Sequence, residues 1–232
     1  MRNILSAIGE TPLVSLQSIG KGLQHEILGK CEHLNPGGSV KDRIALAIVD
    51  EAERRGDLKP GGTLVEATAG NTGVGLAIVA ALRGYRLICV MPEKMSEDKR
   101  QALRALGAEV VITDNVSPDH PDYFQRVACQ IAKERANCFW TNQFANQVNP
   151  KIHEQTTAVE IWRQTQGQIS AFVTGVGTGG TITGVGRYLK KMNPEIQIVL
   201  ADPVGSSLAG LINSGQMGEG GSYLVEGIGS SV

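Results

Sequence analysis

The sequence predicts an α/β protein with mostly parallel sheets, and two observations support that prediction. From about residue 60 onward, short runs rich in β-branched and apolar residues alternate with amphipathic helical runs, a pattern typical of parallel strands covered by helices. Glycine is also frequent: 29 of the 232 residues are glycine, a share well above the typical value of about 7%. The glycines gather in loops between apolar runs, where they let the backbone approach a ligand closely.

The individual elements follow in order along the chain. Apolar, β-branched runs predict strands at 13–16, 26–31, 63–67, 86–90, 109–113, 138–140, 171–174 and 197–201. Helical periodicity predicts helices at 40–55, 72–83, 96–106, 123–136, 155–164 and 181–192. Gly84 and Gly107 follow two of these helices, as C-terminal capping glycines do. Asn, Gln and Pro cluster over 142–150 and indicate a domain boundary, and residues 203–232 are expected to form loops and one short helix.

Charge and composition exclude several classes of protein. The formal net charge is −1, from 22 basic and 23 acidic residues, and only 4% of residues are aromatic, which argues against nucleic-acid binding. No apolar run approaches the roughly 18 residues of a membrane span. The N-terminus lacks the apolar stretch of a secretory signal, so we expect a soluble cytoplasmic protein. The four cysteines form no CxxC pair, and no metal site is predicted.

Lys41 stands out at the start of the helix expected over 40–55. Ser39 followed by Asp42 is a capping-box pattern, which places Lys41 in the first turn, where the helix dipole disfavours a cation. At helical spacing Lys41 shares one face with Ile44, Ala45, Ile48 and Ala52. Burial and the helix start both favour a neutral amine, which a Schiff-base nucleophile requires. The alternative is a lysine that reaches solvent from the edge of this apolar stripe.

A glycine-rich loop over 174–181 lies between an expected strand and an expected helix. Its backbone N–H groups and the helix dipole suit an anion, for which phosphate is the natural choice. Thr178 and Thr181 add hydroxyl donors. The alternative is a tight turn that binds no ligand.

The same loop also matches the dinucleotide fingerprint, as Gly175-x-Gly177-x-x-Gly180 with Asp202 after the next strand. An NAD-dependent oxidoreductase is therefore a remote alternative. The late position of the loop and its threonine content count against it.

A second loop, residues 67–73, joins another strand to a helix N-terminus. Its hydroxyls, its amide side chain and its N–H groups suit a carboxylate. The alternative is that Asn71 or Thr72 merely caps the helix.

A buried lysine, a phosphate loop and a carboxylate loop together indicate pyridoxal phosphate acting on an amino acid. At this point the sequence resembles the β-family of pyridoxal-phosphate enzymes, which contains cysteine synthase, cystathionine β-synthase and their relatives. The matching stretches run through nearly the whole chain in the family's order: 9–13, 35–43, 68–73, 143–144, 149–150, 177–181 and 226–229.

The resemblance implies a role for each matching position. Lys41 would carry the Schiff base to the cofactor and move the α-proton of the substrate, and Asn71 would bond the ring hydroxyl of the cofactor. The cofactor phosphate would be held by Gly177, Thr178, Gly179, Gly180 and Thr181. The amino-acid substrate would be bound by Thr68, Ala69, Gly70, Thr72, Gln143 and Gly227.

The resemblance also implies the architecture of the family. It predicts two α/β domains of the tryptophan-synthase-β-like fold (fold type II), with the cofactor between them, and a homodimer. Residues 1–40 and 146–232 would form the larger, cofactor-binding domain, and residues 41–145 the smaller, mobile substrate domain.

The implied reaction is β-replacement on serine or an O-acylserine with a thiol. Segments 91–96, 117–121 and 202–206 look most similar to cystathionine β-synthases, which predicts serine with homocysteine. The alternative is the cysteine synthase pair, O-acetylserine with sulfide. Ala67 and Ala69 replace the Pro and Ser that are common in the family, which leaves the substrate preference open. A remote alternative outside the enzymes is a two-lobed amino-acid binding protein.

The resemblance finally implies more chain after Val232, including a Ser or Thr whose hydroxyl faces the pyridine nitrogen of the cofactor. We therefore expect the larger domain to be incomplete at its C-terminus.

Overall fold

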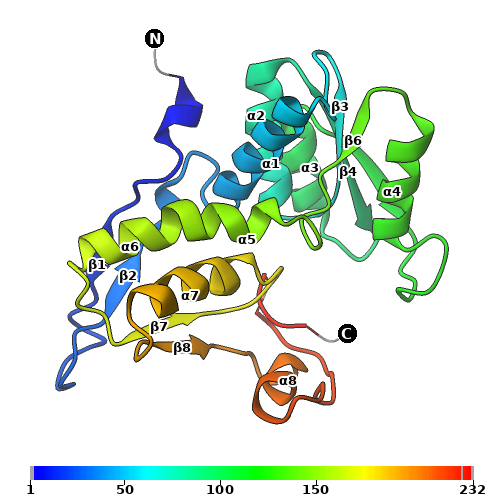
Figure 1. Ribbon diagram of the computed structural model, residues 1–232. Coiled ribbons are helices and arrows are strands. Elements are labelled where there is room, and N and C mark those ends of the chain that lie inside the picture. Colours follow the sequence, from blue (N-terminus) through cyan, green and yellow to red (C-terminus); the bar gives the residue numbers. More distant parts are fainter. Residues whose placement is uncertain (1–2, 226, 231–232) are drawn as a thin grey trace. The chain divides into compact units, whose positions relative to one another are not determined.

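The computed structural model of the protein describes residues 3–225 and 227–230 (Figure 1). It divides into two compact units, Met1–Val148 and Asn149–Val232. Each unit combines parallel strands with helices, which confirms the predicted α/β class. The units and the predicted domains divide the chain differently over residues 1–40, and the assignment of these residues to a larger domain stays a prediction.

The first unit is built on a four-stranded parallel sheet in the order β5-β4-β3-β6. The strands are β3 (Thr63–Ala67), β4 (Arg86–Pro92), β5 (Glu109–Thr113) and β6 (Cys138–Trp140). The helices are α1 (Lys41–Arg55), α2 (Asn71–Arg83), α3 (Glu97–Ala105) and α4 (Phe124–Glu134). These bounds lie within two residues of the predicted ones, and Gly84 adopts the left-handed conformation that ends α2.

Both faces of this sheet are buried, as continuous apolar strands predict. Leu64 and Leu87 pack with α1 and α2 in one core cluster. Their chain neighbours Val65 and Ile88 pack on the opposite face with Ala128 of α4. Figure 1 shows α4 (green) on the other side of the strands from α1 and α2 (blue to cyan).

The N-terminal part of the first unit holds shorter elements than predicted. A 3₁₀ turn, η1 (Ile4–Ala7), precedes the antiparallel pair β1 (Leu13–Ser15) and β2 (Leu28–Lys30), and a second turn, η2 (Glu32–Leu34), follows it. The two strands pair over three residues each, Leu13–Ser15 with Leu28–Lys30, so the ends of the predicted runs lie outside the sheet. Local sequence patterns did not indicate the two 3₁₀ turns.

The second unit has a β7-α7-β8 core. The parallel strands β7 (Ala171–Thr174) and β8 (Gln197–Leu200) are joined by α7 (Gly180–Met192). Val185 and Leu189 of α7 pack with Ile161 and Ile196. A short helix, α8 (Leu208–Ser214), follows, as predicted for this region.

The helix predicted over 155–164 begins earlier and is irregular. It runs through α5 (Val148–Ile152), the π-helical turn η3 (His153–Thr157) and α6 (Ala158–Gln164). Pro150 fits because the first turn of a helix needs no N–H at that position. Among the described residues, no helix combines the length and the apolar character needed to cross a membrane.

Candidate active site

Lys41 is the first residue of α1, and the apolar face predicted for this helix is confirmed. Ile44, Ala45 and Ile48 are at most 1% exposed, and Lys41 itself is partly buried. Burial lowers the pKa of the Lys41 amine, while the nearby Glu32 carboxylate opposes that shift. The surroundings of Lys41 therefore shift its protonation equilibrium toward the neutral amine. Its role as the cofactor-linking residue stays a prediction.

The capping box predicted at this helix start is formed differently. The Ser39 hydroxyl accepts a hydrogen bond from the N–H of Lys41 at 3.2 Å, and the Asp42 carboxylate accepts one from the N–H of Gly37 at 2.5 Å. Asp42 thus closes the glycine turn before the helix, since Gly37 has no side chain to keep the carboxylate away. The two residues still fix the position at which α1 begins.

A partly buried ion pair that sequence analysis missed supports the same segment. The Arg43 guanidinium donates from Nε and Nη2 to the two oxygens of Glu32, each at 2.8 Å. The Thr11 hydroxyl donates to Glu32 at 2.7 Å and the Asn35 amide at 2.9 Å. Burial alone would raise the pKa of Glu32, but Arg43, Thr11 and Asn35 outweigh it and the net pKa is lowered. These contacts join the segments 9–13 and 35–43 through Glu32.

The predicted carboxylate loop follows β3 and leads into α2. No side chain caps the start of α2, where Gly70 is the N-cap residue. The alternative interpretation, that Asn71 or Thr72 serves as the cap, is therefore wrong. Instead, the Thr72 hydroxyl donates to Oε1 of Gln143 at 2.6 Å, and Asn71 is exposed. The loop and Gln143 lie 71 residues apart in sequence, and the sheet brings them together.

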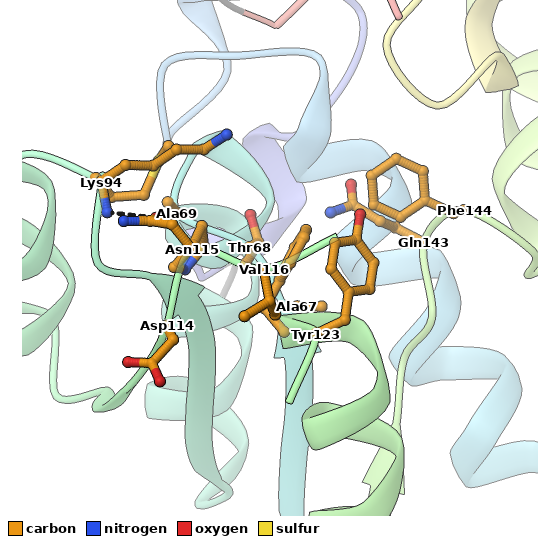
Figure 2. Close-up of a pocket in the computed structure, with 13 residues that line it drawn as sticks. Ala67, Thr68, Ala69, Lys94, Asp114, Asn115, Val116, Tyr123, Gln143 and Phe144 are labelled. Carbon is orange, nitrogen blue, oxygen red and sulfur yellow. Dashed lines mark hydrogen bonds between the residues drawn. The ribbon is translucent and has the colours of Figure 1, made fainter. Parts of the chain in front are cut away.

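A cavity of about 480 Å³ lies at the carboxyl ends of the strands of this sheet (Figure 2). Its lining includes three of the predicted substrate residues, Thr68, Ala69 and Gln143. Figure 2 shows Thr68, Tyr123 and Gln143 presenting polar ends to the same space, with the Lys94 side chain extending above Ala69. The remaining lining residues are Ala67, Pro92, Met95, Asp114, Asn115, Val116, Phe124 and Phe144. Carboxyl ends of parallel strands are the usual ligand sites of open α/β sheets.

The predicted phosphate loop of the second unit lies at the start of α7. Gly179 has a φ of +81°, and a side chain added there would meet nothing within 4 Å. No backbone N–H group of residues 177–181 donates to another residue in the described part of the chain. The Asn149 amide donates to the Thr178 hydroxyl oxygen at 2.9 Å, which leaves the Thr178 proton to donate elsewhere. The donor set and the open space at Gly179 fit a phosphate group.

Two side chains that contact this loop, Asn149 and His153, were not predicted from the sequence to do so. Asn149 packs so closely that a Cβ at Gly180 would collide with its amide. His153 is 1% exposed; its Nδ1 lies 2.9 Å from the Thr157 hydroxyl and its Nε2 lies 3.4 Å from the Thr181 hydroxyl. His153 is the first residue of the π-helical turn η3, and such turns occur often at functional sites.

Gly227 and Asp202 are the last two candidate residues that the sequence analysis named. Gly227 is exposed, and a side chain at Gly177 would meet the Gly227 carbonyl oxygen at 2.6 Å. Glu226, part of the same predicted motif, lies outside the described residues, as does Val232. Asp202, the acid of the dinucleotide alternative, accepts from the N–H of Ala209 at 2.8 Å. It thereby holds the start of α8.

Comparison with known proteins identifies the family of which such sites are typical. The family model described as "Pyridoxal-phosphate dependent enzyme" matches residues 4–231. The cystathionine β-synthase of Apis mellifera is 50% identical over 99% of this chain and 46% of its own length. Cysteine synthase 1 of Neurospora crassa is 47% identical over 98% of this chain and 61% of its own length. The chain thus spans about half the length of the curated relatives it matches.

Solved structures agree with these sequence matches. The crystal structure of an O-ureido-L-serine synthase superposes with a TM-score of 0.87 at 37% identity, covering 100% of this chain and 70% of that one. A hydrogen sulfide-producing enzyme from Fusobacterium nucleatum gives a TM-score of 0.86 at 36% identity, covering 99% of this chain and 72% of that one.

Proposed function

Because this chain belongs to the pyridoxal-phosphate-dependent enzymes, we propose that it catalyses β-replacement on serine, with homocysteine as the incoming thiol and cystathionine as the product. The family match over residues 4–231 supports the reaction class, together with the relatives named cystathionine β-synthase and cysteine synthase. The cavity beside Thr68 and Gln143 supports the choice of substrates.

Each group of site residues has its own role in the proposed reaction. Bound pyridoxal phosphate supplies an electron sink for the negative charge that develops at the substrate α-carbon. The N–H groups and hydroxyls of the 177–181 loop bind the phosphate, and Asn71 donates to the ring hydroxyl. The loop over 68–72 and Gln143 bind the substrate carboxylate. Lys41 would hold the cofactor before the substrate binds and, once its amine is free, would remove the proton from the α-carbon.

The overall change balances without an oxidant or reductant. The bond between Cβ and the hydroxyl oxygen of serine breaks, and a bond between Cβ and the homocysteine sulfur forms. The thiol proton leaves with the hydroxyl group as water, and the amine of Lys41 returns the α-proton. A lysine whose pKa is lowered by burial accepts and returns a proton near neutral pH more readily than an ordinary lysine.

Lys94 supports homocysteine as the acceptor. It lines the same cavity as Thr68 and Gln143, and it forms no ion pair with a residue that the structure describes. Its backbone is anchored, because the Lys94 N–H donates to Oδ1 of Asn115 at 2.9 Å. Met95, Val116 and Phe144 provide apolar walls, which suit the short aliphatic chain of homocysteine. Its carboxylate would then pair with the Lys94 ammonium, whereas sulfide has no group that needs either feature.

The alternative, cysteine synthesis from O-acetylserine and sulfide, is favoured by the relatives named cysteine synthase. A substrate panel on the full-length protein separates the two. We expect cystathionine from serine and homocysteine, identified by mass spectrometry. Turnover of O-acetylserine with sulfide, and none of serine with homocysteine, would assign the protein to the alternative.

Substitution of Lys94 tests the acceptor site directly. We expect Lys94→Gln to raise KM for homocysteine by about fivefold, as the loss of an exposed ion pair does, and to leave KM for serine unchanged. Lys133→Gln, which removes an exposed charge from α4, serves as the control and should change neither constant. Equal KM values for homocysteine in the wild type and Lys94→Gln would remove Lys94 from the acceptor site.

We further infer a cytoplasmic homodimer. All four cysteines of the chain are free thiols, which agrees with a reducing compartment. The family resemblance supports the dimer, and analytical ultracentrifugation of the full-length protein tests it.

A further inference from the structure

Glu66 is a buried carboxylate in a strand that is otherwise apolar or small. It is 0% exposed and forms no ion pair with any described residue. Its Oε1 accepts from the N–H of Ala67 at 2.8 Å, and its Oε2 accepts from the Thr141 hydroxyl at 2.5 Å and the Gln143 N–H at 3.0 Å. Burial raises the pKa of Glu66, and these three hydrogen bonds oppose that shift. A carboxylate placed in a core at such a cost requires an explanation.

The two donors to Oε2 lie on either side of a residue with a positive φ. Asn142, between Thr141 and Gln143, has a φ of +47°, in the left-handed region, which asparagine adopts less readily than glycine and more readily than most other residues with a Cβ. Because one oxygen of Glu66 binds the residue before Asn142 and the residue after it, the carboxylate closes this turn. The turn leads directly from the end of β6 to Gln143.

The turn sets the direction of the Gln143 side chain. Oε1 of Gln143 accepts from the Thr72 hydroxyl at 2.6 Å, and Figure 2 shows the amide nitrogen turned toward the middle of the cavity. Glu66 is not among the residues that line that cavity. Glu66 therefore reaches a ligand only through neighbours that line the cavity, Ala67 and Gln143, and of these two Gln143 has the polar side chain.

We propose that Glu66 is a positioning residue, whose carboxylate holds the turn at Asn142 in its left-handed conformation and thereby aims Gln143 at the α-carboxylate of the amino-acid substrate. This inference rests on the proposed function, since it assumes that Gln143 binds that carboxylate. It explains why an acidic residue lies inside β3, beside a site that must attract an anion.

The test compares Glu66→Gln with the wild type as full-length, cofactor-loaded protein. The amide keeps the shape of the side chain but replaces one acceptor by a donor that faces other donors. We expect KM for serine to rise roughly tenfold, as the loss of a hydrogen bond to a charged group implies, with kcat changing less than twofold. L-alanine has no leaving group, so calorimetry of its binding gives a second readout that needs no turnover, and its Kd should rise by the same factor. Cofactor affinity should not change.

A second substitution separates positioning from general stability. Glycine adopts positive φ without penalty, so Asn142→Gly in the Glu66→Gln background should restore most of the lost affinity for L-alanine. Gln166 also has a positive φ, of 53°, in the other unit. Gln166→Gly in the same background is the matched control and should restore nothing.

If Glu66→Gln does not fold, Thr141→Val tests the same proposal. It removes one of the three donors and should raise Kd for L-alanine by about threefold. An unchanged Kd in Glu66→Gln or Thr141→Val, or equal rescue by both glycine substitutions, overturns the positioning role while the proposed function stands. A wild-type protein that neither binds L-alanine nor converts serine overturns both.

Discussion

Lys41 lies where a cation is poorly stabilised, and this position is the main reason for assigning it a chemical role. It is the first residue of α1, where the helix dipole has the same sign as an ammonium group, and burial lowers the pKa of its amine. A residue that weakens the folded state yet matches a chemical need is typical of an active site. The spacing of Lys41 with Ile44 and Ile48 was enough to predict this from the sequence.

We expect Lys41→Met to stabilise the cofactor-free protein. Because the pKa of Lys41 is lowered in the folded state, that state binds the proton more weakly than the unfolded chain, and the charge reduces the free energy of unfolding at neutral pH. The gain at pH 7 should be about 0.5 kcal/mol, and it should shrink as the pH rises toward the ordinary lysine pKa. Urea unfolding at several pH values measures it. Lys59→Met, at an exposed position, is the control, and a loss of stability in Lys41→Met would contradict the account.

Other site residues could not be found from local patterns. Asn149 and His153 act through Thr178 and Thr181, which lie about 30 residues further along the chain. Glu66 acts through residues 75 and 77 positions away. In the sequence, Glu66 is visible only as an acid inside an apolar strand, and His153 only as a histidine inside a helix. Their roles become apparent only from the tertiary contacts.

At the scale of elements, periodicity predicted the regular strands and helices and missed the irregular ones. β3, β5, β6 and β7 have the predicted bounds, because each is an apolar run bounded by turn residues. The π turn η3 depends on the close approach of α7, where a Cβ at Gly184 would collide with the Pro150 carbonyl oxygen and with His153. Such a tertiary constraint leaves no periodic trace in the sequence.

The phosphate loop is an element whose backbone, rather than its hydroxyls, should set cofactor affinity. A side chain at Gly179 would enter the open space in front of the loop and would also strain a residue with a φ of +81°. We therefore expect Gly179→Leu to raise Kd for pyridoxal phosphate more than Thr178→Ala does, by at least tenfold. Spectroscopic titration of the cofactor-free protein measures both. The reverse order would mean that the side-chain hydroxyls hold the phosphate.

At the scale of the whole molecule, the fold predicted from the resemblance is confirmed. Two α/β units are present, and the TM-scores of 0.87 and 0.86 show that the chain shares its fold with an O-ureido-L-serine synthase and a hydrogen sulfide-producing enzyme. Lys41 and the 68–73 loop belong to the first unit and the 177–181 loop to the second. The central claim of the proposed function is that Lys41 holds the cofactor covalently.

Borohydride reduction of the full-length protein followed by peptide mapping tests that claim most directly. Reduction makes a carbon–nitrogen link between lysine and cofactor permanent, so mass spectrometry locates it. We expect a phosphopyridoxyl group on the peptide that contains Lys41, and none on any peptide of Lys41→Ala. A label on another lysine, or a label that persists in Lys41→Ala, would contradict the account.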